Sequence, residues 1–450
     1  MKQPHLVVLG GGFAGLELCK ELGDIPVRIT LVDRQNHHLF QPLLYQVASA
    51  GLAAPEIAHP IRSVFSDQRN IHVVMDEATG IDLEHQTVSL RDAEDPITYD
   101  YLAIGIGVKT GYFGNDHWEE FAPGLKSLDD ATQIRRQVLL AYEKAENCED
   151  PGQRKRLMTS VVVGGGPTGV ELAGAFAEIA RHVLKRDFRE IDTSAARIYL
   201  VEAADRLLTM YDERLSEYTR KKLTALGVTV VTGRMVKEIT EGKVDLGDEV
   251  IEAETIIWAA GVEAPALTKT LGVELDRGGR IIVDGDLSVP GHPEVFAMGD
   301  IANCVDQSGI RVPGLCPAAL QMGKHVAQVI SNEVGLTARR GYPVRKQFRY
   351  FDKGSMATIG RSAAVASSMG MRFTGLPAWL MWLFVHLMFL VGFRNKIAVM
   401  IQWFYSYLRY RRGARIITGV DDSGLIQHPV ELRPLDSARP RTEGALSEVS

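Results

Sequence analysis

The stretch HLVVLGGGFAG at residues 5–15 decides the fold of the first part of the chain. Its apolar half predicts a short buried strand over residues 5–10, and the residues from Phe13 to Leu22 have the pattern of the helix that follows. The next strand is expected over residues 27–33 and ends on Asp33. A strand, a G-x-G-x-x-G turn, a helix and a second strand form a βαβ unit, so the sequence opens as an α/β dinucleotide-binding fold with a parallel sheet.

Each part of this turn has a mechanical role. Gly10 permits the tight turn, Gly12 lets backbone N–H groups approach a pyrophosphate, and Gly15 allows the helix to pack closely on the strand. The helix N-terminus supplies positive potential to phosphates, and Asp33 is expected to accept hydrogen bonds from the ribose hydroxyls. The residues expected to bind this first dinucleotide are Gly10, Gly12, Phe13, Ala14, Gly15, Asp33 and Arg34.

A second unit of the same kind begins 154 residues later, with a strand over residues 160–164 and a helix over residues 169–184. Its next strand ends on Glu202, and we assign the longer interval to a charged extension of the helix over residues 182–196. Glu202 would repel a ribose 2′-phosphate, which favours NADH over NADPH, although an ordinary carboxylate at a strand end would look the same. The residues expected to bind this second dinucleotide are Gly164, Gly166, Gly169, Glu202 and Gly261.

Two dinucleotide sites in one chain indicate a resident FAD and a visiting NADH. Residues 294–304 (EVFAMGDIANC) predict a strand followed by Gly299 and Asp300, and Asp300 is the candidate partner of the flavin ribityl hydroxyls. A helix is expected to begin near Pro317, because proline is favoured at a first helical position. That helix either directs its N-terminus at the flavin pyrimidine, which would stabilise the reduced anion, or is a buried core helix.

Composition limits the other classes of function. The 450 residues carry a net charge of −6, which argues against a nucleic-acid partner. The four cysteines form no C-x-x-C pair and no zinc spacing, so neither a disulfide framework nor a metal site is expected. The first strand follows the N-terminus too closely for a signal peptide, and we expect the catalytic bulk of the protein in the cytosol.

The C-terminal part differs from the rest in charge and hydropathy. Residues 353–420 contain nine Lys or Arg and no Asp or Glu, and residues 376–393 form an apolar run that only His386 interrupts. Three of the five tryptophans, Trp379, Trp382 and Trp403, lie in this part, where we expect them as interfacial aromatics, and a shorter apolar segment follows the run at residues 397–410. This pattern favours monotopic attachment to an anionic bilayer surface. A single short membrane span and a buried or dimer-forming helix pair are the alternatives.

Several long motifs in order resemble the two-dinucleotide-binding-domain flavoproteins, and among them the type II NADH dehydrogenases. The resemblance extends from Pro4 to about Gly419, and its marks are VVLGGGFAGLE, DRQNHHLFQPLLYQVA, VVVGGGPTGVELAGA, VFAMGDIANC, PAALQMGKHVA and FRYFDKGSMATIGR. It implies a membrane-attached enzyme that holds FAD without a covalent bond, oxidises NADH, reduces a membrane quinone and pumps no protons. A homodimer is compatible with it.

The resemblance also assigns roles to single residues. Gln321 matches the second glutamine of the family's quinone-site A-Q-x-A-x-Q motif, but Pro317 stands where the first glutamine is expected. Glu171 matches a family glutamate associated with the quinone site or with protons, although a carboxylate in the first turn of a helix is also a good dipole partner. Lys353 is a candidate for favouring negative charge on reduced flavin, or a solvated lysine in a turn.

The sequence therefore predicts two Rossmann-like domains and a C-terminal membrane-attachment segment. The expected boundaries are residues 1–125 with 285–335 for FAD, 126–284 for NADH, 336–432 for the membrane and 433–450 for a disordered tail, with a turn or linker near residues 143–155. Disulfide or sulfide oxidoreductases of the same fold are alternatives, which the missing C-x-x-C and the intact second turn disfavour. A non-catalytic NADH-sensing flavoprotein is an alternative of another class.

Overall fold

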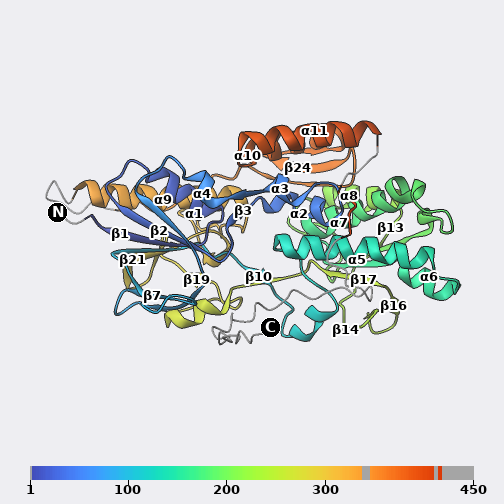
Figure 1. Ribbon diagram of the computed structural model, residues 1–450, viewed down its shortest axis with the longest axis horizontal. Helices are drawn as coiled ribbons and strands as arrows, with labels where there is room; N and C mark the ends of the chain where they lie inside the picture. Colours follow the sequence, from blue (N-terminus) through green and yellow to red (C-terminus); the bar gives the residue numbers. More distant parts are fainter. Residues whose placement is uncertain (1–2, 337–344, 410–413, 418–450) are drawn as a thin grey trace, which may run out of the picture.

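The structure is a computed structural model that describes residues 3–336, 345–409 and 414–417. Two α/β halves lie side by side along the longest axis, and a pair of C-terminal helices covers one edge of both (Figure 1). The tail expected at residues 433–450 lies outside the described residues. The two-domain α/β architecture with C-terminal helices confirms the predicted fold class.

The first half is built on a six-stranded sheet with the order β20-β21-β9-β1-β2-β5. Its centre is β1 (His5–Leu9), which is buried throughout and pairs in parallel with β2 (Arg28–Asp33) and β9 (Tyr101–Ile104). The other strands are β5 (Ile71–Met75), β20 (Ser288–Val289) and β21 (His292–Ala297), so the chain returns to this sheet after the second half. Strands buried on both faces explain the uninterrupted apolar run in the sequence.

Two helices cover one face of this sheet. Helix α1 (Phe13–Glu21) and helix α9 (Cys316–Leu336) pack directly against each other. A Cβ at Gly323 would lie 2.3 Å from the Ala14 carbonyl oxygen, so a glycine is needed for this close approach. The helix expected near Pro317 is confirmed, with the proline in its first turn.

The second half contains a four-stranded parallel sheet with the order β13-β12-β11-β17. The strands are β11 (Thr159–Val163), β12 (Arg197–Val201), β13 (Val228–Val231) and β17 (Thr255–Trp258). Helices α5 (Leu128–Glu146), α7 (Pro167–Glu178) and α8 (Glu213–Ala225) belong to this half. The smaller elements of both halves include α2 (Leu44–Ala48), α3 (Ala54–Ile57), β3 (His37–Leu39), β4 (Ala58–Pro60), β6 (Ala78–Asp82), β7 (Thr87–Leu90), β8 (Ile97–Thr98), β14 (Glu238–Thr240), β15 (Lys243–Asp245) and β16 (Val250–Glu252).

Two details of the second half correct the sequence-based expectation. The charged segment 182–196 does not extend helix α7, which passes into a π-turn (Ile179–Val183) and a 3-10 turn (Leu184–Arg186) and then ends. The carboxylate of Glu146 accepts hydrogen bonds from the backbone N–H groups of residues 189–191, which a continuing helix would have used internally. The expected linker at residues 143–155 is largely helical, because Asp150 caps α6 (Pro151–Leu157) by accepting from the N–H of Gln153.

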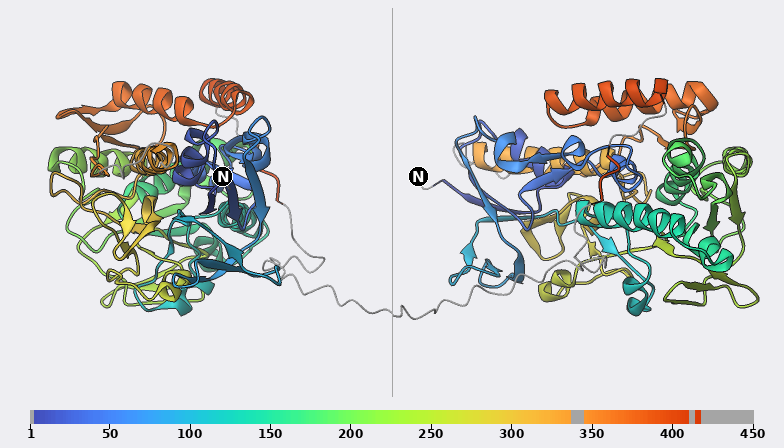
Figure 2. Two further views of the ribbon diagram at one scale, coloured as in Figure 1. Left: turned by 90° about the vertical axis from the view of Figure 1, so that its left-hand side faces the viewer. Right: turned by 45° about the vertical axis from the view of Figure 1, so that its right-hand side comes forward.

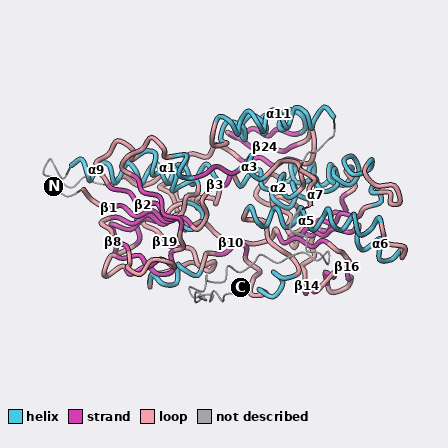
Figure 3. The backbone as a smooth tube through the Cα atoms, viewed as in Figure 1, coloured by secondary structure: helices cyan, strands magenta, loops and turns pink. Residues whose placement is uncertain are grey.

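Two short strands run between the halves, as Figure 3 shows: β10 (Lys109–Thr110) and β18 (Val262–Glu263) pair antiparallel. The C-terminal unit adds the antiparallel sheet β23 (Ser355–Thr358), β24 (Ala364–Ser368) and β25 (Met371–Thr374). It packs closely on helix α7, because a Cβ at Gly174 would lie 2.9 Å from the backbone nitrogen of Gly360. This contact places the turn after β23 beside the second dinucleotide-binding unit.

The last two helices, α10 (Gly375–Phe389) and α11 (Phe393–Arg409), lie together on the outer edge of the molecule in both views of Figure 2. Their outward face is apolar, with Leu380, Phe384, Ile401 and Phe404 at least half exposed. Among the described residues, no helix has both the length and the hydropathy needed to cross a membrane.

The tryptophans of these helices are not at the outer face, contrary to the expectation of interfacial aromatics. Trp379, Trp382 and Trp403 are all at most 8% exposed and point into the protein. The indole N–H of Trp403 donates to Gln46 on helix α2, and the ring of Trp382 stacks on His386. Leucine, phenylalanine, methionine and isoleucine form the exposed face instead.

Candidate active site

The two glycine turns have the same geometry, which confirms the duplicated pattern in the sequence. The N–H of Gly10 donates to the carbonyl of Val32 over 2.8 Å, and the N–H of Gly164 donates to that of Val201 over 2.7 Å. Both glycines have positive φ, 101° and 115° respectively. Such angles favour glycine, so each turn is fixed by the residue type at its first position.

The third glycine of each turn lies against the first. A Cβ at Gly15 would stand 2.0 Å from the Gly10 carbonyl oxygen, and a Cβ at Gly169 would stand 1.8 Å from that of Gly164. These distances leave no room for any side chain. The spacing G-x-G-x-x-G therefore follows from contact between the helix and the turn.

A carboxylate closes each turn from the end of the second strand. Oδ2 of Asp33 accepts from the N–H of Gly11 over 2.6 Å, and Oε2 of Glu202 accepts from the N–H of Gly165 over 2.5 Å. Burial raises the pKa of Asp33, while the N–H groups of Gln35 and Gly11 oppose that shift. Both carboxylates thus hold the glycine turn directly, in addition to any role toward a ribose.

The middle glycine of each turn faces open space. A Cβ at Gly166 would meet nothing within 4 Å, and one at Gly12 would meet only the Gly105 carbonyl oxygen at 3.9 Å. A side chain there would fill the space in front of the helix N-terminus, where a pyrophosphate binds in this type of turn. The residues present therefore fit one dinucleotide at each turn.

Asp300 lies in the 3-10 turn Gly299–Ile301 after β21, as expected from its Gly-Asp sequence. Burial raises its pKa, and the charges of Lys126 and Arg280 oppose this shift. Burial likewise lowers the pKa of Lys126, and Asp300 opposes that. A half-buried acid and base thus lie near enough to influence each other's charge, and nothing in the sequence pattern pointed to Lys126.

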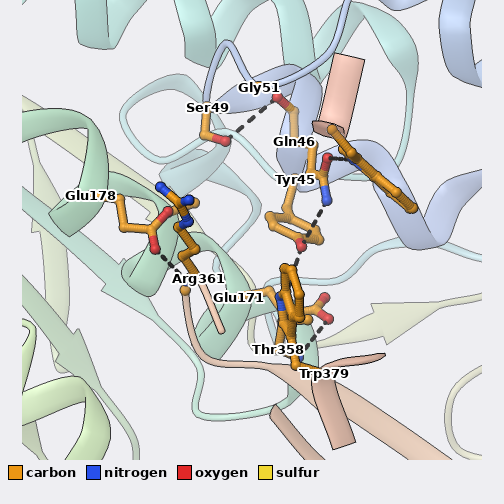
Figure 4. Close-up of a pocket in the computed structure, with 12 residues that line it drawn as sticks. Tyr45, Gln46, Ser49, Gly51, Glu171, Glu178, Thr358, Arg361 and Trp379 are labelled. Carbon is orange, nitrogen blue, oxygen red and sulfur yellow. Dashed lines mark hydrogen bonds between the residues drawn. The ribbon is translucent and has the colours of Figure 1, made fainter. Parts of the chain in front are cut away.

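Glu171 stands between two cavities. The larger one, of about 330 Å³, is lined by Glu171 together with Phe40, Tyr211, Lys353 and His386, and Pro317 and Phe389 are also part of its wall. The smaller one, of about 40 Å³, lies on the other side, toward Glu178 and Arg361 (Figure 4). We call these the large cavity and the small cavity.

The carboxyl group of Glu171 is buried, with 8% of the residue exposed. Burial raises its pKa to about 8. Hydrogen bonds from Thr358 act in the opposite direction, and the N–H of this residue donates to Oε1 over 3.2 Å. Glu171 is the fifth residue of α7, so the interpretation that it is a first-turn dipole partner is wrong. A carboxyl group held near neutral pH inside a protein is suited to carry a proton.

A chain of buried polar groups leads from helix α11 to this carboxyl group (Figure 4). Nε1 of Trp403 donates to Oε1 of Gln46 over 2.8 Å, and Nε2 of Gln46 donates to the Tyr45 hydroxyl over 3.1 Å. The hydroxyls of Tyr45 and Thr358 are 3.0 Å apart. An indole N–H is only a donor, so it fixes the orientation of the Gln46 amide and, through it, the direction of the chain toward Glu171.

The remaining sequence-based candidates lie at the walls of the cavities. Gln321 uses both ends of its amide on the backbone of Phe351, with Nε2 donating over 3.0 Å and Oε1 accepting over 2.9 Å. It lines a further cavity of about 400 Å³ together with Pro317 and Lys353. The exposed Lys353 also reaches the large cavity, with its ammonium 5.6 Å from the ring centre of Phe389.

His386 is a site residue that the sequence showed only as an interruption of an apolar run. It stacks on Trp382 with a centre-to-centre distance of 4.0 Å, and burial lowers its pKa to about 4. Its Nδ1 lies 2.8 Å from the Trp382 carbonyl oxygen, so that nitrogen carries the proton in the neutral ring. The sequence held no signal for this role, because a histidine inside an apolar helix is equally typical of a packed core.

The two glycine turns on parallel sheets, with a buried carboxyl group and cavities beside the second turn, are typical of an α/β oxidoreductase with two dinucleotide-binding units. Residues 4–323 match the family model described as pyridine nucleotide-disulphide oxidoreductase, and residues 353–412 match the NDH2 C-terminal domain. Among the described residues, no group of three His, Cys, Asp or Glu side chains could hold a metal ion.

Sequence relatives narrow this class. The chain is 43% identical to the type II NADH:quinone oxidoreductase Ndh of Mycobacterium tuberculosis, over 93% of this chain and 91% of that protein. It is 29% identical to an internal alternative NAD(P)H-ubiquinone oxidoreductase of Arabidopsis thaliana, over 92% of this chain and 86% of the relative. The chain belongs to the type II NADH:quinone oxidoreductase family.

Solved structures agree on the fold. The structure of NDH2 from Plasmodium falciparum in complex with NADH has a TM-score of 0.83 at 20% identity, and covers 92% of this chain and 100% of its own. The sulfide:quinone oxidoreductase of Aquifex aeolicus has a TM-score of 0.69 at 19% identity, over 90% of this chain and 95% of its own. At these identities the likeness concerns the fold alone.

Proposed function

We propose that the protein is an FAD-dependent NADH:quinone oxidoreductase that pumps no protons and is attached to the cytoplasmic face of the cell membrane. The observation that carries this proposal is the position of Glu171, a buried carboxyl group at the wall of a large cavity that the second glycine turn and the N-terminal end of α9 also line. A flavin chemistry that ends on a quinone requires such a cavity and a proton beside it.

The first turn is the proposed FAD site. Asp33 would accept hydrogen bonds from the ribose of the cofactor, and Asp300 and Lys126 would contact its ribityl and phosphate groups. When bound, FAD accepts a hydride from NADH and passes two electrons to a quinone. The N-terminal end of α9 and the ammonium of Lys353 would both favour negative charge at this position.

The second turn is the proposed NADH site, with Gly164, Gly166 and Gly169 at the phosphates. Glu202 supports NADH over NADPH, because its carboxylate is fixed by the N–H groups of Gly165 and Ala204 and cannot swing away from a 2′-phosphate. Gly261 allows the close approach of the adjoining loop, since a Cβ there would lie 2.7 Å from the Gly111 carbonyl oxygen.

The large cavity is the proposed quinone pocket. Its wall combines apolar side chains with a few polar groups, as in typical ligand pockets. Glu171 would hold the proton for the quinol. Gln321 lines the neighbouring cavity of about 400 Å³ and supports its wall rather than acting through a free amide, because both ends of that amide are occupied. Pro317, which stands where the family's first glutamine is expected, lines both cavities.

Attachment to the membrane is proposed to be monotopic, through the exposed faces of α10 and α11. Their exposed apolar side chains follow a helical spacing, and basic residues such as Arg394 flank them, which suits an anionic leaflet. A lipophilic quinone would reach the large cavity beside the same helices, since His386 and Phe389 of α10 form part of its wall.

Stopped-flow absorbance tests the function. Anaerobic NADH should bleach the flavin, and a water-soluble quinone should restore its colour at a comparable rate. A flavin that NADH bleaches but quinone does not restore would contradict the proposed function and favour an NADH-sensing role.

A further inference from the structure

The small cavity beside Glu171 is lined by residues for which the proposed hydride transfer from NADH to FAD has no use. It is lined by Tyr45, Thr358 and two carboxylates of one helix face, Glu171 and Glu178, with Arg361 at its wall (Figure 4). Its volume of about 40 Å³ is room for roughly three water molecules. Polar and apolar side chains share its lining, and the carboxylates and hydroxyls among them are the hydrogen-bond partners that water in such a cavity needs.

The cavity extends from the buried carboxyl group toward the outside of the protein. Glu171 and Glu178 are seven residues apart on α7, which is two helical turns or roughly 10 Å. Glu171 is 8% exposed, whereas Glu178 is partly exposed and accepts a hydrogen bond from the N–H of Arg361. The two carboxyl groups thus mark the inner and outer ends of one polar void.

The turn that carries Arg361 leaves space for the Glu178 carboxylate at the outer end of the small cavity, because it contains a glycine, Gly360. Gly360 has a φ of 65°, and a Cβ there would lie 2.8 Å from Oε1 of Glu178. Any side chain at this position would press on the Glu178 carboxylate. A glycine is required both for the backbone angle and for the space.

The stoichiometry of the proposed reaction needs such an entrance. A hydride from NADH carries two electrons and one proton, and a quinone takes up two electrons and two protons to become a quinol. One proton for each turnover must therefore come from water, and it must reach Glu171, whose side chain is buried.

We propose that the small cavity is the proton entrance of the enzyme, through which solvent protons pass Glu178 and the enclosed water to reach Glu171. An O–H bond of Glu171 breaks as the O–H bond of the quinol forms, and the resulting carboxylate takes a proton from water in the small cavity. That water is reprotonated from the side of Glu178. This inference rests on the proposed function, because it concerns the quinone step alone.

The groups that face Glu171 permit this cycle without another acid. Tyr45 on α2 and Thr358 on β23 are linked hydroxyls, Tyr211 lies before α8, and His386 on α10 is neutral. Lys353 borders the large cavity, and Lys126 borders a third cavity, of about 80 Å³, that Glu171 also lines. Of the carboxyl groups in the two cavities that Glu171 separates, only Glu178 stands between it and solvent among the described residues.

The test measures the two half-reactions separately in the FAD-loaded enzyme. Glu178→Gln should leave flavin reduction by NADH within about twofold, and should slow reoxidation by a water-soluble quinone about tenfold or more, since positioned acids and bases contribute at least this much. Small weak acids such as formic acid should restore the rate, because they can bring protons to the cavity. Glu213→Gln, an exposed change on α8, is the matched control and should change neither step.

A second variant and a second measurement keep the proposal testable if Glu178→Gln does not fold. Ala175→Val narrows the cavity between the two carboxyl groups and leaves both in place. It should slow reoxidation in the same way. In both variants, infrared difference spectra should show slower hydrogen–deuterium exchange of the Glu171 carboxyl group, independent of turnover.

The outcomes separate the two proposals. If wild-type flavin is not reoxidised by quinone, the proposed function is wrong. If wild-type reoxidation is fast, Glu171→Gln slows it, and Glu178→Gln and Ala175→Val leave both the rate and the exchange unchanged, the small cavity is not the entrance.

Discussion

The indole nitrogen of Trp403 lies 2.8 Å from the side-chain oxygen of Gln46, a residue 357 positions earlier in the chain. This bond joins the second C-terminal helix to α2, which packs on α5 and α7. Through Tyr45 and Thr358 the same chain ends at Glu171. The helices proposed to contact lipid are therefore fixed to the carboxyl group proposed to supply the proton.

Trp403→Phe should lower the free energy of unfolding by about 1–3 kcal/mol, because it leaves the buried oxygen of Gln46 without its donor. Denaturant titration measures this loss. A double-mutant cycle with Gln46→Leu should show a coupling of about 0.5–3 kcal/mol, because the two changes remove the same bond. Additive effects would mean that the contact contributes nothing to stability.

Glu171→Gln should change how stability depends on pH. The carboxyl group has an ordinary pKa of 4.5 when unfolded and about 8 when folded, so the folded state binds the extra proton between these values. Stability is unaffected by this group below pH 4.5, falls by about 1.4 kcal/mol for each pH unit above it, and reaches its full loss above pH 8. The variant lacks this titration.

Urea titrations at pH 5 and pH 7 check this sign. Between these values the wild type should lose about 3 kcal/mol that Glu171→Gln retains. Quinone reduction by the wild type should also decline above pH 8, as Glu171 loses its proton. Parallel pH curves for the two proteins would show that Glu171 is already ionised in the folded state at pH 5.

Sequence alone was sufficient for the dinucleotide turns, because local rules determine them. Gly10, Gly15 and Asp33 are close in the chain, and each has a role that one residue type performs. Glu171 was identified only through a family resemblance, and its environment could not be derived. Its burial depends on Thr358 and on the C-terminal unit, which lie almost 190 residues away.

Two differences between the sequence-based expectation and the structure have a common cause. The charged segment 182–196 has the local pattern of a helix extension, because nothing near it in the chain indicates that Glu146 binds its backbone. By residue type the three C-terminal tryptophans are expected at a membrane interface, whereas Trp403 is buried with its indole N–H bonded to Gln46. For the charged segment and for Trp403, a single distant polar partner overrides the local pattern.

Gly360→Ala should destabilise the protein more than Gly370→Ala. Both glycines have positive φ, 65° and 74°, so each substitution has a similar backbone cost of about 1–2 kcal/mol. Only the Cβ at position 360 meets neighbours, Oε1 of Glu178 at 2.8 Å and Cδ1 of Leu226 at 2.9 Å, whereas position 370 is open. The difference between the two melting temperatures measures the crowding against these two side chains. Equal melting temperatures would mean that both side chains move aside freely.

Glu202→Ala should raise the KM for NADH about tenfold, because it removes a ribose acceptor and two hydrogen bonds that hold the turn, at about 1.4 kcal/mol in total. The KM for NADPH should rise less or fall, since the repulsion of its 2′-phosphate is lost. Steady-state rates with both nucleotides measure the ratio. Asp95→Ala, in an exposed loop, is the control. An unchanged ratio would mean that Glu202 only supports the turn.

Leu380→Glu combined with Phe384→Glu should abolish binding to vesicles of anionic lipid. The two side chains are 53% and 66% exposed on the outer face of α10, and each charge would have to enter the apolar boundary of the bilayer. Co-sedimentation with vesicles measures attachment. Oxidation of NADH with a water-soluble quinone should persist, because neither side chain lines the large cavity.

Met235→Glu, equally exposed on the second half of the molecule at 62%, should leave vesicle binding unchanged. If the double variant still sediments with vesicles while remaining folded, another surface attaches the protein, and the apolar face of α10 needs a different explanation.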